Sequence, residues 1–242
     1  MANGATRVAL LAGASGLTGG YVLDNLLAAP DFARVIAVTR RPLVREHGHL
    51  ANRIVQFDRL QAQLQGVSCD VALCCLGTTI RTAGSRENFR QVDVDYVVAF
   101  ARAALAARAQ RFVVMSSVGA DPRSNNFYLR TKGEMEQQLE GLGFPSLDIL
   151  QPGVLLGLRR EMRPLELAAM LLMPLATPFL TGKRAPLRAI SARRVAAAMV
   201  GVTRSSRKGV QRYAGPAIEA LARIAPPRGP APAPERKAAR AR

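Results

Sequence analysis

The 242-residue sequence has no tryptophan, and only 5% of its residues are aromatic. Proteins that bind nucleic acid by stacking bases on aromatic rings need such side chains. The sequence also contains no recognisable nucleic-acid-binding module. We therefore expect no specific nucleic-acid partner, although the formal net charge is +17. The basic excess is C-terminal: residues 1–157 carry 16 basic and 13 acidic side chains, whereas residues 158–242 carry 18 and 4.

Cysteine and histidine are also scarce. The three cysteines, Cys69, Cys74 and Cys75, are odd in number and two are adjacent, which indicates neither a disulfide framework nor a metal-binding spacing. The two histidines, His47 and His49, have no accompanying ligand pattern, so we expect no metal site. This composition favours a reducing compartment, and we expect a cytoplasmic location.

No stretch has the uninterrupted apolar length of a membrane span, and the N-terminus lacks the pattern of a signal peptide. Residues 164–180 are apolar but short, and they are interrupted by Pro174 and Pro178. We expect this segment to pack over the rest of the domain as a lid; a partner-binding surface and a membrane-surface helix are the alternatives. Residues 1–5 are predicted to be flexible, and the Pro/Ala/Arg-rich segment 225–242 is predicted to be a disordered tail.

Hydrophobic residues make up 49% of the chain, which excludes global disorder and allows a large core. Short apolar runs alternate with segments in which apolar residues recur every three or four positions. Strands are predicted over 7–13, 34–40, 53–58, 70–76, 111–117, 147–155 and 210–214, and helices over 18–28, 60–65, 86–109, 127–142, 191–203 and 216–224. Such alternation is typical of a doubly wound parallel α/β sheet of the Rossmann type. We expect this core over residues 6–157, with residues 158–224 as a substrate or partner region completing the same domain.

A glycine-rich loop follows the first predicted strand. Gly13, Gly16 and Gly19 form the pattern G-x-x-G-x-x-G between a strand and a helix. The first glycine permits a tight turn, the second lets backbone N–H groups approach a pyrophosphate, and the third lets the helix pack closely on the strand. The loop therefore predicts a dinucleotide site; a serine-hydrolase elbow is disfavoured because the G-x-S-x-G pattern is missing. The other loop residues expected to contact the cofactor are Ser15, Leu17 and Thr18.

The end of the second predicted strand bears on the choice of cofactor. An NAD site usually has an acidic residue there for the ribose 2′-hydroxyl, whereas this chain has Arg40 and Arg41. Two guanidinium groups suit the dianionic 2′-phosphate of NADP, so we expect NADP(H) in preference to NAD(H). The alternative is a pair of solvated arginines. Asp58, at the end of the third predicted strand, is placed to accept a hydrogen bond from the adenine amino group.

Tyr128 and Lys132 lie four residues apart in the segment YLRTK, downstream of a predicted strand that ends in MSS. The pentapeptide alone favours the first turn of a surface helix, with the ring packed and the ammonium solvated. Its position in the chain, however, puts Tyr128 near the carboxyl edge of the sheet, where ligands bind in such folds. Lys132 follows one helical turn later on the same face. This position favours a cofactor site.

These motifs occur in order with the strings CLGTT, VDVDY, SNNFYLRTKGE and QPGVLLG. Over roughly residues 6–215 the chain resembles the atypical short-chain dehydrogenase/reductase family typified by the Tat-interacting protein, within the wider group of NAD-dependent epimerase/dehydratase-like proteins. The resemblance implies a Rossmann-type sheet, NADP(H) and Tyr-x-x-x-Lys chemistry.

The resemblance also implies roles for individual residues. Lys132 would hydrogen-bond the nicotinamide ribose and favour the phenolate form of Tyr128, which would exchange a proton with a carbonyl or alcohol oxygen. Ser117 would orient that oxygen; Ser116 is the alternative, because a shift of one residue at a strand end reverses the side chain. Further cofactor contacts would come from Cys75, Leu76, Gly77, Pro152, Gly153 and Val154. We expect Cys75 to be packed rather than reactive.

One departure from the family pattern concerns an asparagine that extended members carry in the fourth long helix. This chain has Asp93 or Asp95 there, which puts the proton relay through that asparagine in question. Two functions stay open: an NADP(H)-dependent oxidoreductase acting on a small carbonyl or alcohol, and a cofactor-sensing interaction protein with the same fold. The Ser/Tyr/Lys set favours the enzyme. We expect a monomer or homodimer without peripheral membrane contact.

Overall fold

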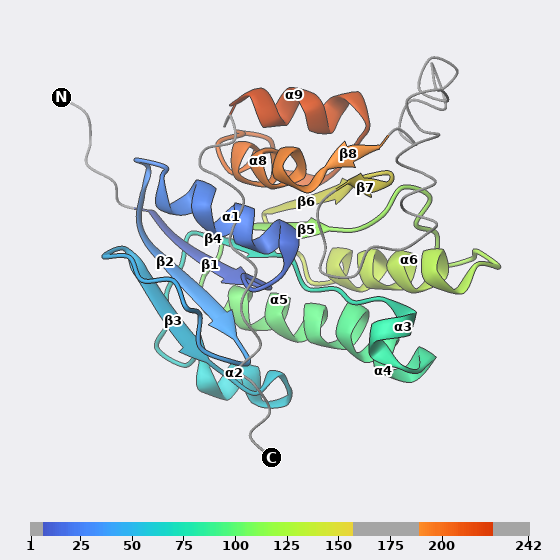
Figure 1. The fold of residues 1–242 in the computed structure, drawn as a ribbon, viewed down its shortest axis with the longest axis horizontal. Coiled ribbons are helices and arrows are strands. Elements are labelled where there is room, and N and C mark those ends of the chain that lie inside the picture. Colours follow the sequence, from blue (N-terminus) through green and yellow to red (C-terminus); the bar gives the residue numbers. More distant parts are fainter. Residues whose placement is uncertain (1–6, 157–188, 225–242) are drawn as a thin grey trace.

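The computed structural model describes residues 7–156 and 189–224, and the predicted flexible N-terminus, apolar segment 164–180 and tail lie outside them. Seven parallel strands form one sheet in the order β3-β2-β1-β4-β5-β6-β9, with helices on both faces (Figure 1). The strands are β1 (Arg7–Ala12), β2 (Phe32–Thr39), β3 (Leu50–Ile54), β4 (Val71–Cys74), β5 (Arg111–Met115), β6 (Ser146–Gln151) and β9 (Gly209–Ala214). This is the doubly wound Rossmann-type sheet that the alternating pattern predicts.

The helices follow the predicted apolar periodicity. They are α1 (Leu17–Leu27), α2 (Leu60–Gln63), α3 (Ile80–Ala83), α4 (Arg86–Arg90), α5 (Tyr96–Ala106), α6 (Phe127–Glu140), α8 (Ala192–Val202) and α9 (Pro216–Ile224). The short strands β7 (Leu155–Leu156) and β8 (Ile190–Ser191) form a separate two-stranded sheet, which the sequence did not predict.

Alternate residues of the strands feed two hydrophobic cores. Ala9 and Leu11 of β1 face α1, α8 and α9, whereas Leu10 and Ala12 face α2, α5 and α6. This alternation follows from the two-residue period of a strand, and it explains why the strands read as continuous apolar runs. The layer of α8 and α9 packs tightly because Gly201 has no side chain: a Cβ there would lie 2.3 Å from the carbonyl oxygen of Leu221.

The sheet changes direction between β1 and β4. Strand β1 pairs with β2 through Leu10 and Ile36, and with β4 through Leu10 and Ala72. Strands β2 and β3 continue the sheet on one side of this pair, and β5, β6 and β9 continue it on the other. In such sheets ligands bind at the carboxyl ends of the strands beside this switch point.

Two predicted elements differ from the structure. The third strand was predicted over 53–58 but ends at Ile54, because β2 ends at Thr39 and offers no partner beyond it. Phe57–Arg59 forms a 3₁₀ turn instead, with Phe57 buried against Tyr96 at a ring-centroid distance of 5.3 Å. The helix predicted over 86–109 is interrupted by a π turn, Gln91–Asp95 (η2), between α4 and α5.

Candidate cofactor and active site

The glycine loop brings the backbones of β1 and β4 unusually close. Gly13 has φ +85°, and a Cβ there would lie 2.6 Å from the carbonyl carbon and oxygen of Cys75. A Cβ at Gly19 would lie 1.9 Å from the carbonyl oxygen of Gly13. Only glycine fits these two positions, because any side chain would overlap backbone atoms. The loop therefore forms a cradle of bare backbone at the switch point.

Helix α1 begins inside this cradle, at Leu17. Its N-cap is Gly16, which provides no side-chain cap, and its first turn has no acidic residue. The N–H groups of the first turn and the positive end of the helix dipole are thus available to an anion. Thr18 is buried and Ser15 is exposed at the loop surface. The residues present fit a cofactor pyrophosphate.

The loop after β2 has a shape fixed by the buried hydroxyl of Thr39 and the half-buried amide of Asn52. The Thr39 hydroxyl donates a hydrogen bond to the Arg41 carbonyl oxygen at 2.7 Å and accepts one from Asn52 Nδ2 at 2.7 Å. Asn52 Oδ1 in turn accepts from the Leu43 N–H at 2.8 Å. Both Arg40 and Arg41 are exposed on this loop. Sequence reasoning missed Asn52, because the strand predicted over 53–58 begins after it, whereas β3 includes it.

Asp58 lies in the 3₁₀ turn and not at a strand end, which corrects its expected position. Burial raises the pKa of the Tyr96 phenol, and the charge of Asp58 and a hydrogen bond to it raise that pKa further, while Arg40 opposes the rise. The pKa of Tyr96 therefore responds both to Asp58, the residue predicted to receive the adenine amino group, and to Arg40 of the β2 loop.

Lys132 forms a buried ion pair. Its ammonium Nζ lies 2.7 Å from Asp93 Oδ1, and the side chains are 6% and 1% exposed. Asp93 Oδ2 accepts a hydrogen bond from the Thr78 N–H at 2.8 Å, in the loop that follows β4. Burial lowers the pKa of Lys132, but the charges of Asp93 and Tyr128 together with the hydrogen bond to Asp93 raise it above its ordinary value. Lys132 is therefore charged at neutral pH.

Tyr128 lies one helical turn before Lys132. Its side chain is 36% exposed, and its ring contacts the buried Phe89 at a centroid distance of 5.9 Å. The two residues share one face of α6, and the charge of Tyr128 is among the influences that raise the pKa of Lys132. Gly77 lies against the Lys132–Asp93 ion pair: a Cβ at this position would be 3.4 Å from Asp93 Oδ1 and 4.0 Å from Lys132 Nζ. The structure thus brings Tyr128, Lys132 and the β4 loop together.

The two serines after β5 have different surroundings. The hydroxyl of Ser116 is buried and donates to Glu136 Oε1 at 2.5 Å. Glu136 also accepts from Gln151 Nε2 at 2.9 Å and from Arg212 Nε at 3.1 Å. Ser117 is only half-buried, and its hydroxyl contacts the Val118 carbonyl oxygen at 3.4 Å. Sequence reasoning missed the Glu136 network, because its members come from four elements.

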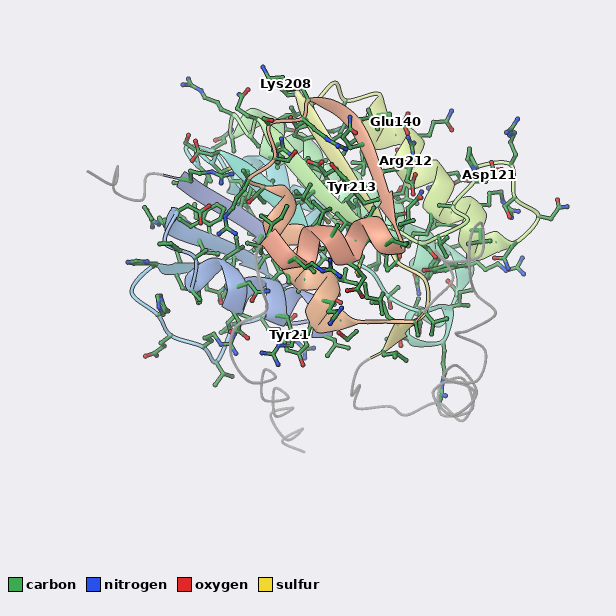
Figure 2. The ribbon with its side chains drawn as sticks, turned by 90° about the horizontal axis from the view of Figure 1, so that it is seen from above. Tyr21, Asp121, Glu140, Lys208, Arg212 and Tyr213 are labelled. Atoms are coloured by element: carbon green, nitrogen blue, oxygen red, sulfur yellow. The ribbon has the colours of Figure 1, made fainter. Side chains whose placement is uncertain are left out.

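The network fixes α6 to the sheet. Glu136 lies one turn after Lys132 on α6, and Arg212 of β9 bridges it to Glu140. Figure 2 shows Arg212 beside Glu140. Because Ser116 and Gln151 hold the same carboxylate, the helix that carries Tyr128 and Lys132 is tied to the carboxyl ends of β5 and β6.

The remaining expected contacts lie at the same edge of the sheet. Cys75 is buried, with Sγ 3.7 Å from Met199 Sδ, and burial raises the pKa of its thiol well above the ordinary value. It is packed rather than reactive, as expected. The Val118 N–H donates to the Pro152 carbonyl oxygen at 3.1 Å, which brings the Ser117 loop beside the 152–154 segment. The other loop residues are Leu76, Gly153 and Val154, all at least partly accessible.

The glycine cradle, the N-terminus of α1 and the buried Lys132 lie together at the switch point of the sheet. They define the class of protein, which is a nucleotide-binding Rossmann protein. A family described as NAD(P)H-binding matches residues 13–157. Protein HTATIP2 of Rattus norvegicus is 40% identical over 158 residues, which is 64% of this chain and 65% of the rat protein. Protein fmp52, mitochondrial, of Emericella nidulans is 36% identical over 170 residues, or 67% of this chain and 72% of that protein.

Solved structures share the fold at low sequence identity. The human epimerase family protein SDR39U1 with NADPH has a TM-score of 0.58 at 18% identity, covering 86% of this chain and 74% of that one. The Bordetella bronchiseptica enzyme WbmH in complex with NAD+ has a TM-score of 0.64 at 14% identity, covering 90% and 79%.

The chain belongs to the NAD(P)H-binding, HTATIP2-like atypical short-chain dehydrogenase/reductase family. The predicted NADP(H) cofactor is confirmed at the level of that family. The predicted cytoplasmic location is wrong, since fungal relatives from three species are named mitochondrial proteins. The cysteine content indicates only a reducing environment, and it does not distinguish the cytoplasm from mitochondria. No helix within residues 7–156 and 189–224 is long and apolar enough to cross a membrane.

Proposed function

We propose that the chain is an NADP(H)-dependent oxidoreductase that interconverts a small carbonyl compound and the corresponding alcohol. The observation that carries this proposal is the charged, buried Lys132 beside the accessible Tyr128, next to the glycine cradle. A phenol that acts as an acid loses its proton and becomes a phenolate anion. A buried ammonium close to the phenol stabilises that anion.

The cofactor would be held by groups already described. Backbone N–H groups at the start of α1 would bind the pyrophosphate, and Arg40 and Arg41 would bind the 2′-phosphate. Asp93 takes one of the three donors of Lys132, and the other two would bind the nicotinamide ribose. When bound, NADPH supplies the hydride.

The substrate would react between Tyr128 and the nicotinamide. The phenol hydroxyl of Tyr128 would donate its proton to the carbonyl oxygen as the carbonyl carbon gains the hydride, so that an alcohol forms and a phenolate remains. Lys132 would stabilise that phenolate until solvent returns the proton, and the reverse sequence would oxidise an alcohol. Ser117 would donate a hydrogen bond to the same oxygen; it is favoured over Ser116, whose hydroxyl is committed to Glu136.

A second candidate is a cofactor-sensing interaction protein that binds NADPH with little turnover. It is supported by the carboxylate of Asp93, which lies 2.7 Å from the Lys132 ammonium and offsets part of the charge that would activate Tyr128. In this case the C-terminal region, residues 158–224, would contact a partner, whereas in the enzyme it would cover the substrate.

The experiment that separates the two candidates compares Tyr128→Phe with Lys132→Met. On a panel of aldehydes, ketones and alcohols, Tyr128→Phe should abolish any turnover and leave NADPH affinity within about twofold of the unmutated protein, because only the phenol oxygen is lost. Lys132→Met should weaken NADPH binding by about tenfold or more, since it removes a charged donor to the ribose. A protein that binds NADPH and reduces nothing on the panel would favour the sensing function.

A further inference from the structure

The π turn η2, residues Gln91–Asp95, carries two acidic side chains with opposite surroundings. Asp93 is 1% exposed and points into the protein, where it contacts Lys132 and the Thr78 N–H. Asp95 is about half exposed and pairs with Arg90 at 3.1 Å on the surface. A π turn inserts an extra residue into a helix, and such turns are frequent at functional sites. Here the turn separates one buried carboxylate from one solvated carboxylate two residues away.

The buried carboxylate joins three elements that form the proposed site. Oδ1 of Asp93 bonds the ammonium of Lys132 on α6, and Oδ2 bonds the backbone of the loop after β4. Gly77, in the same loop, leaves room for this approach, because a Cβ there would reach 3.4 Å from Oδ1. We propose that Asp93 is a positioning residue for the cofactor: a permanent counter-ion that keeps Lys132 charged and aimed at the ribose. This inference rests on the proposed role of Lys132 as a cofactor-binding residue.

The charge balance around Lys132 explains why a counter-ion is needed. Among the described residues, the titratable groups whose charges act on its ammonium are Asp93 of η2, Tyr128 of α6 and Cys74 of β4. At neutral pH the thiol is protonated, since burial raises the pKa of Cys74 to about 12. Asp93 is therefore the group whose negative charge faces the ammonium at that pH. A lysine buried without such a partner loses its proton readily, because burial penalises the charged form.

The test is the affinity for NADPH of Asp93→Asn, measured by calorimetry from about pH 7 to about pH 9. Asparagine keeps the size of the side chain and an oxygen that can accept the Thr78 N–H, but it removes the charge. We expect the variant to bind NADPH about tenfold more weakly than the unmutated protein at the upper end of this range, because Lys132 will have lost its proton. The matched control, Asp95→Asn, removes the same charge from the same turn and should bind normally.

A double-mutant cycle identifies the route of the effect. If Asp93 acts through Lys132, then Asp93→Asn added to Lys132→Met should weaken NADPH binding no further. An equal loss in the Lys132→Met background would mean that Asp93 acts through the Thr78 backbone, and the proposal would be wrong. Normal binding by Asp93→Asn across the pH range would overturn it as well.

Folding is checked by the melting temperature of each variant. Should Asp93→Asn fail to fold, a folded Asp93→Asn/Lys132→Met protein would support the pairing, because removing both charges relieves an uncompensated buried one. Failure of both variants would assign Asp93 a purely structural role and overturn the proposal. These measurements of affinity and melting temperature do not depend on turnover. If no substrate were found, the proposed oxidoreductase function would be wrong, but the conclusion about Asp93 would still hold.

Discussion

A buried ion pair lies at each end of the parallel strands: one at their amino ends, the amino edge, and one at their carboxyl ends, the carboxyl edge. The acidic member of each pair is 1% exposed, but the two pairs have different surroundings. At the amino edge, Arg111 Nη1 lies 2.7 Å from Asp148 Oδ2. At the carboxyl edge, Lys132 Nζ lies at the same distance from Asp93. Arg111 is surrounded by protein acceptors, whereas Asp93 is the one hydrogen-bonding partner of Lys132 among the residues that the structure describes.

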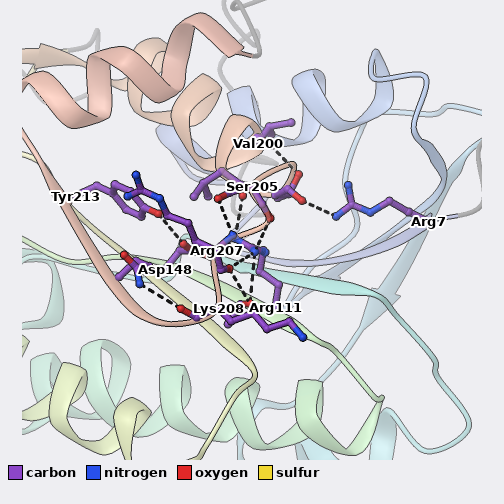
Figure 3. Close-up of polar contacts among 12 residues, drawn as sticks. Arg7, Arg111, Asp148, Val200, Ser205, Arg207, Lys208 and Tyr213 are labelled. Atoms are coloured by element: carbon purple, nitrogen blue, oxygen red, sulfur yellow. Dashed lines mark hydrogen bonds and ion pairs between the residues drawn. The ribbon is translucent and has the colours of Figure 1, made fainter.

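The amino edge is closed. Arg111 donates to the carbonyl oxygens of Val202, Ser205 and Arg207 at 3.0, 2.7 and 2.7 Å, and Tyr213 donates to Asp148 at 3.1 Å (Figure 3). These bonds fix the connection between α8 and β9. A guanidinium suits this task because its five N–H donors have fixed directions. A fully satisfied buried network of this kind stabilises structure.

The carboxyl edge is open by contrast. Among the residues that the structure describes, the Lys132 ammonium bonds Asp93 alone, and the bare glycine cradle and two exposed arginines are open to a ligand. Burial of a charge alone therefore does not mark a functional site. The two pairs differ in how many hydrogen-bonding partners each cation already has, and the cation with fewer partners is the one proposed to bind the cofactor.

The largest effect is expected at the closed edge. Arg111→Met leaves Asp148 buried without its partner and several carbonyl oxygens without donors, so the free energy of unfolding should fall by about 3–5 kcal/mol. Urea denaturation measures this loss, and NADPH affinity of the folded protein should not change. The matched control is Arg123→Met, since Arg123 pairs with Asp121 on the surface at 3.6 Å; it should cost less than about 1 kcal/mol. Equal losses in the two variants would contradict the comparison.

A second expectation is that water is excluded from the buried thiol at each edge. Cys69 precedes β4 at the amino edge and Cys74 ends β4 at the carboxyl edge, and burial raises the pKa of each thiol from 9.0 to about 12. The resulting stability is fully present below the unfolded pKa near 9 and is lost as the pH rises toward the folded value. Above pH 9 each thiol should lower the free energy of unfolding by up to about 1.4 kcal/mol per pH unit.

The measurement is urea denaturation at several alkaline pH values. Cys69→Ala and Cys74→Ala should each flatten the alkaline decline, and comparing slopes removes the separate cost of lost packing. If Cys74→Ala alone left the decline unchanged, water would reach the carboxyl edge more deeply than the burial of Cys74 indicates.

The smallest effect concerns the open edge and its ligand. We expect NADPH to bind about tenfold more tightly than NADH, or about 1.4 kcal/mol, because Arg40 and Arg41 add charge-assisted bonds to the 2′-phosphate. Replacing both arginines by alanine should remove most of this difference in calorimetry. Arg34→Ala is the control, since Arg34 is exposed at the opposite end of the same strand. Equal affinities for the two cofactors in the unmutated protein would show that the arginines are merely solvated.

Much of the fold was readable from local patterns. The runs at 7–13 and 111–117 correspond to β1 and β5, and the helix predicted over 127–142 corresponds to α6. The third strand was misplaced because its end depends on where β2 stops, which is a pairing between distant residues. The π turn was missed because its residues keep the same apolar periodicity as the helices on either side.

The sequence by itself determined the α/β class, the glycine cradle and the Tyr128/Lys132 pair, because each depends on residue types at fixed short spacings. Only the tertiary structure decided that Asp93 and not Asp95 faces Lys132, and that Ser116 rather than Ser117 bonds Glu136. It also decided that Arg111 is structural while Arg40 is accessible. These outcomes depend on which distant groups a side chain meets after folding. A shift of one residue in a turn or at a strand end reverses the direction in which the side chain points, and with it the outcome.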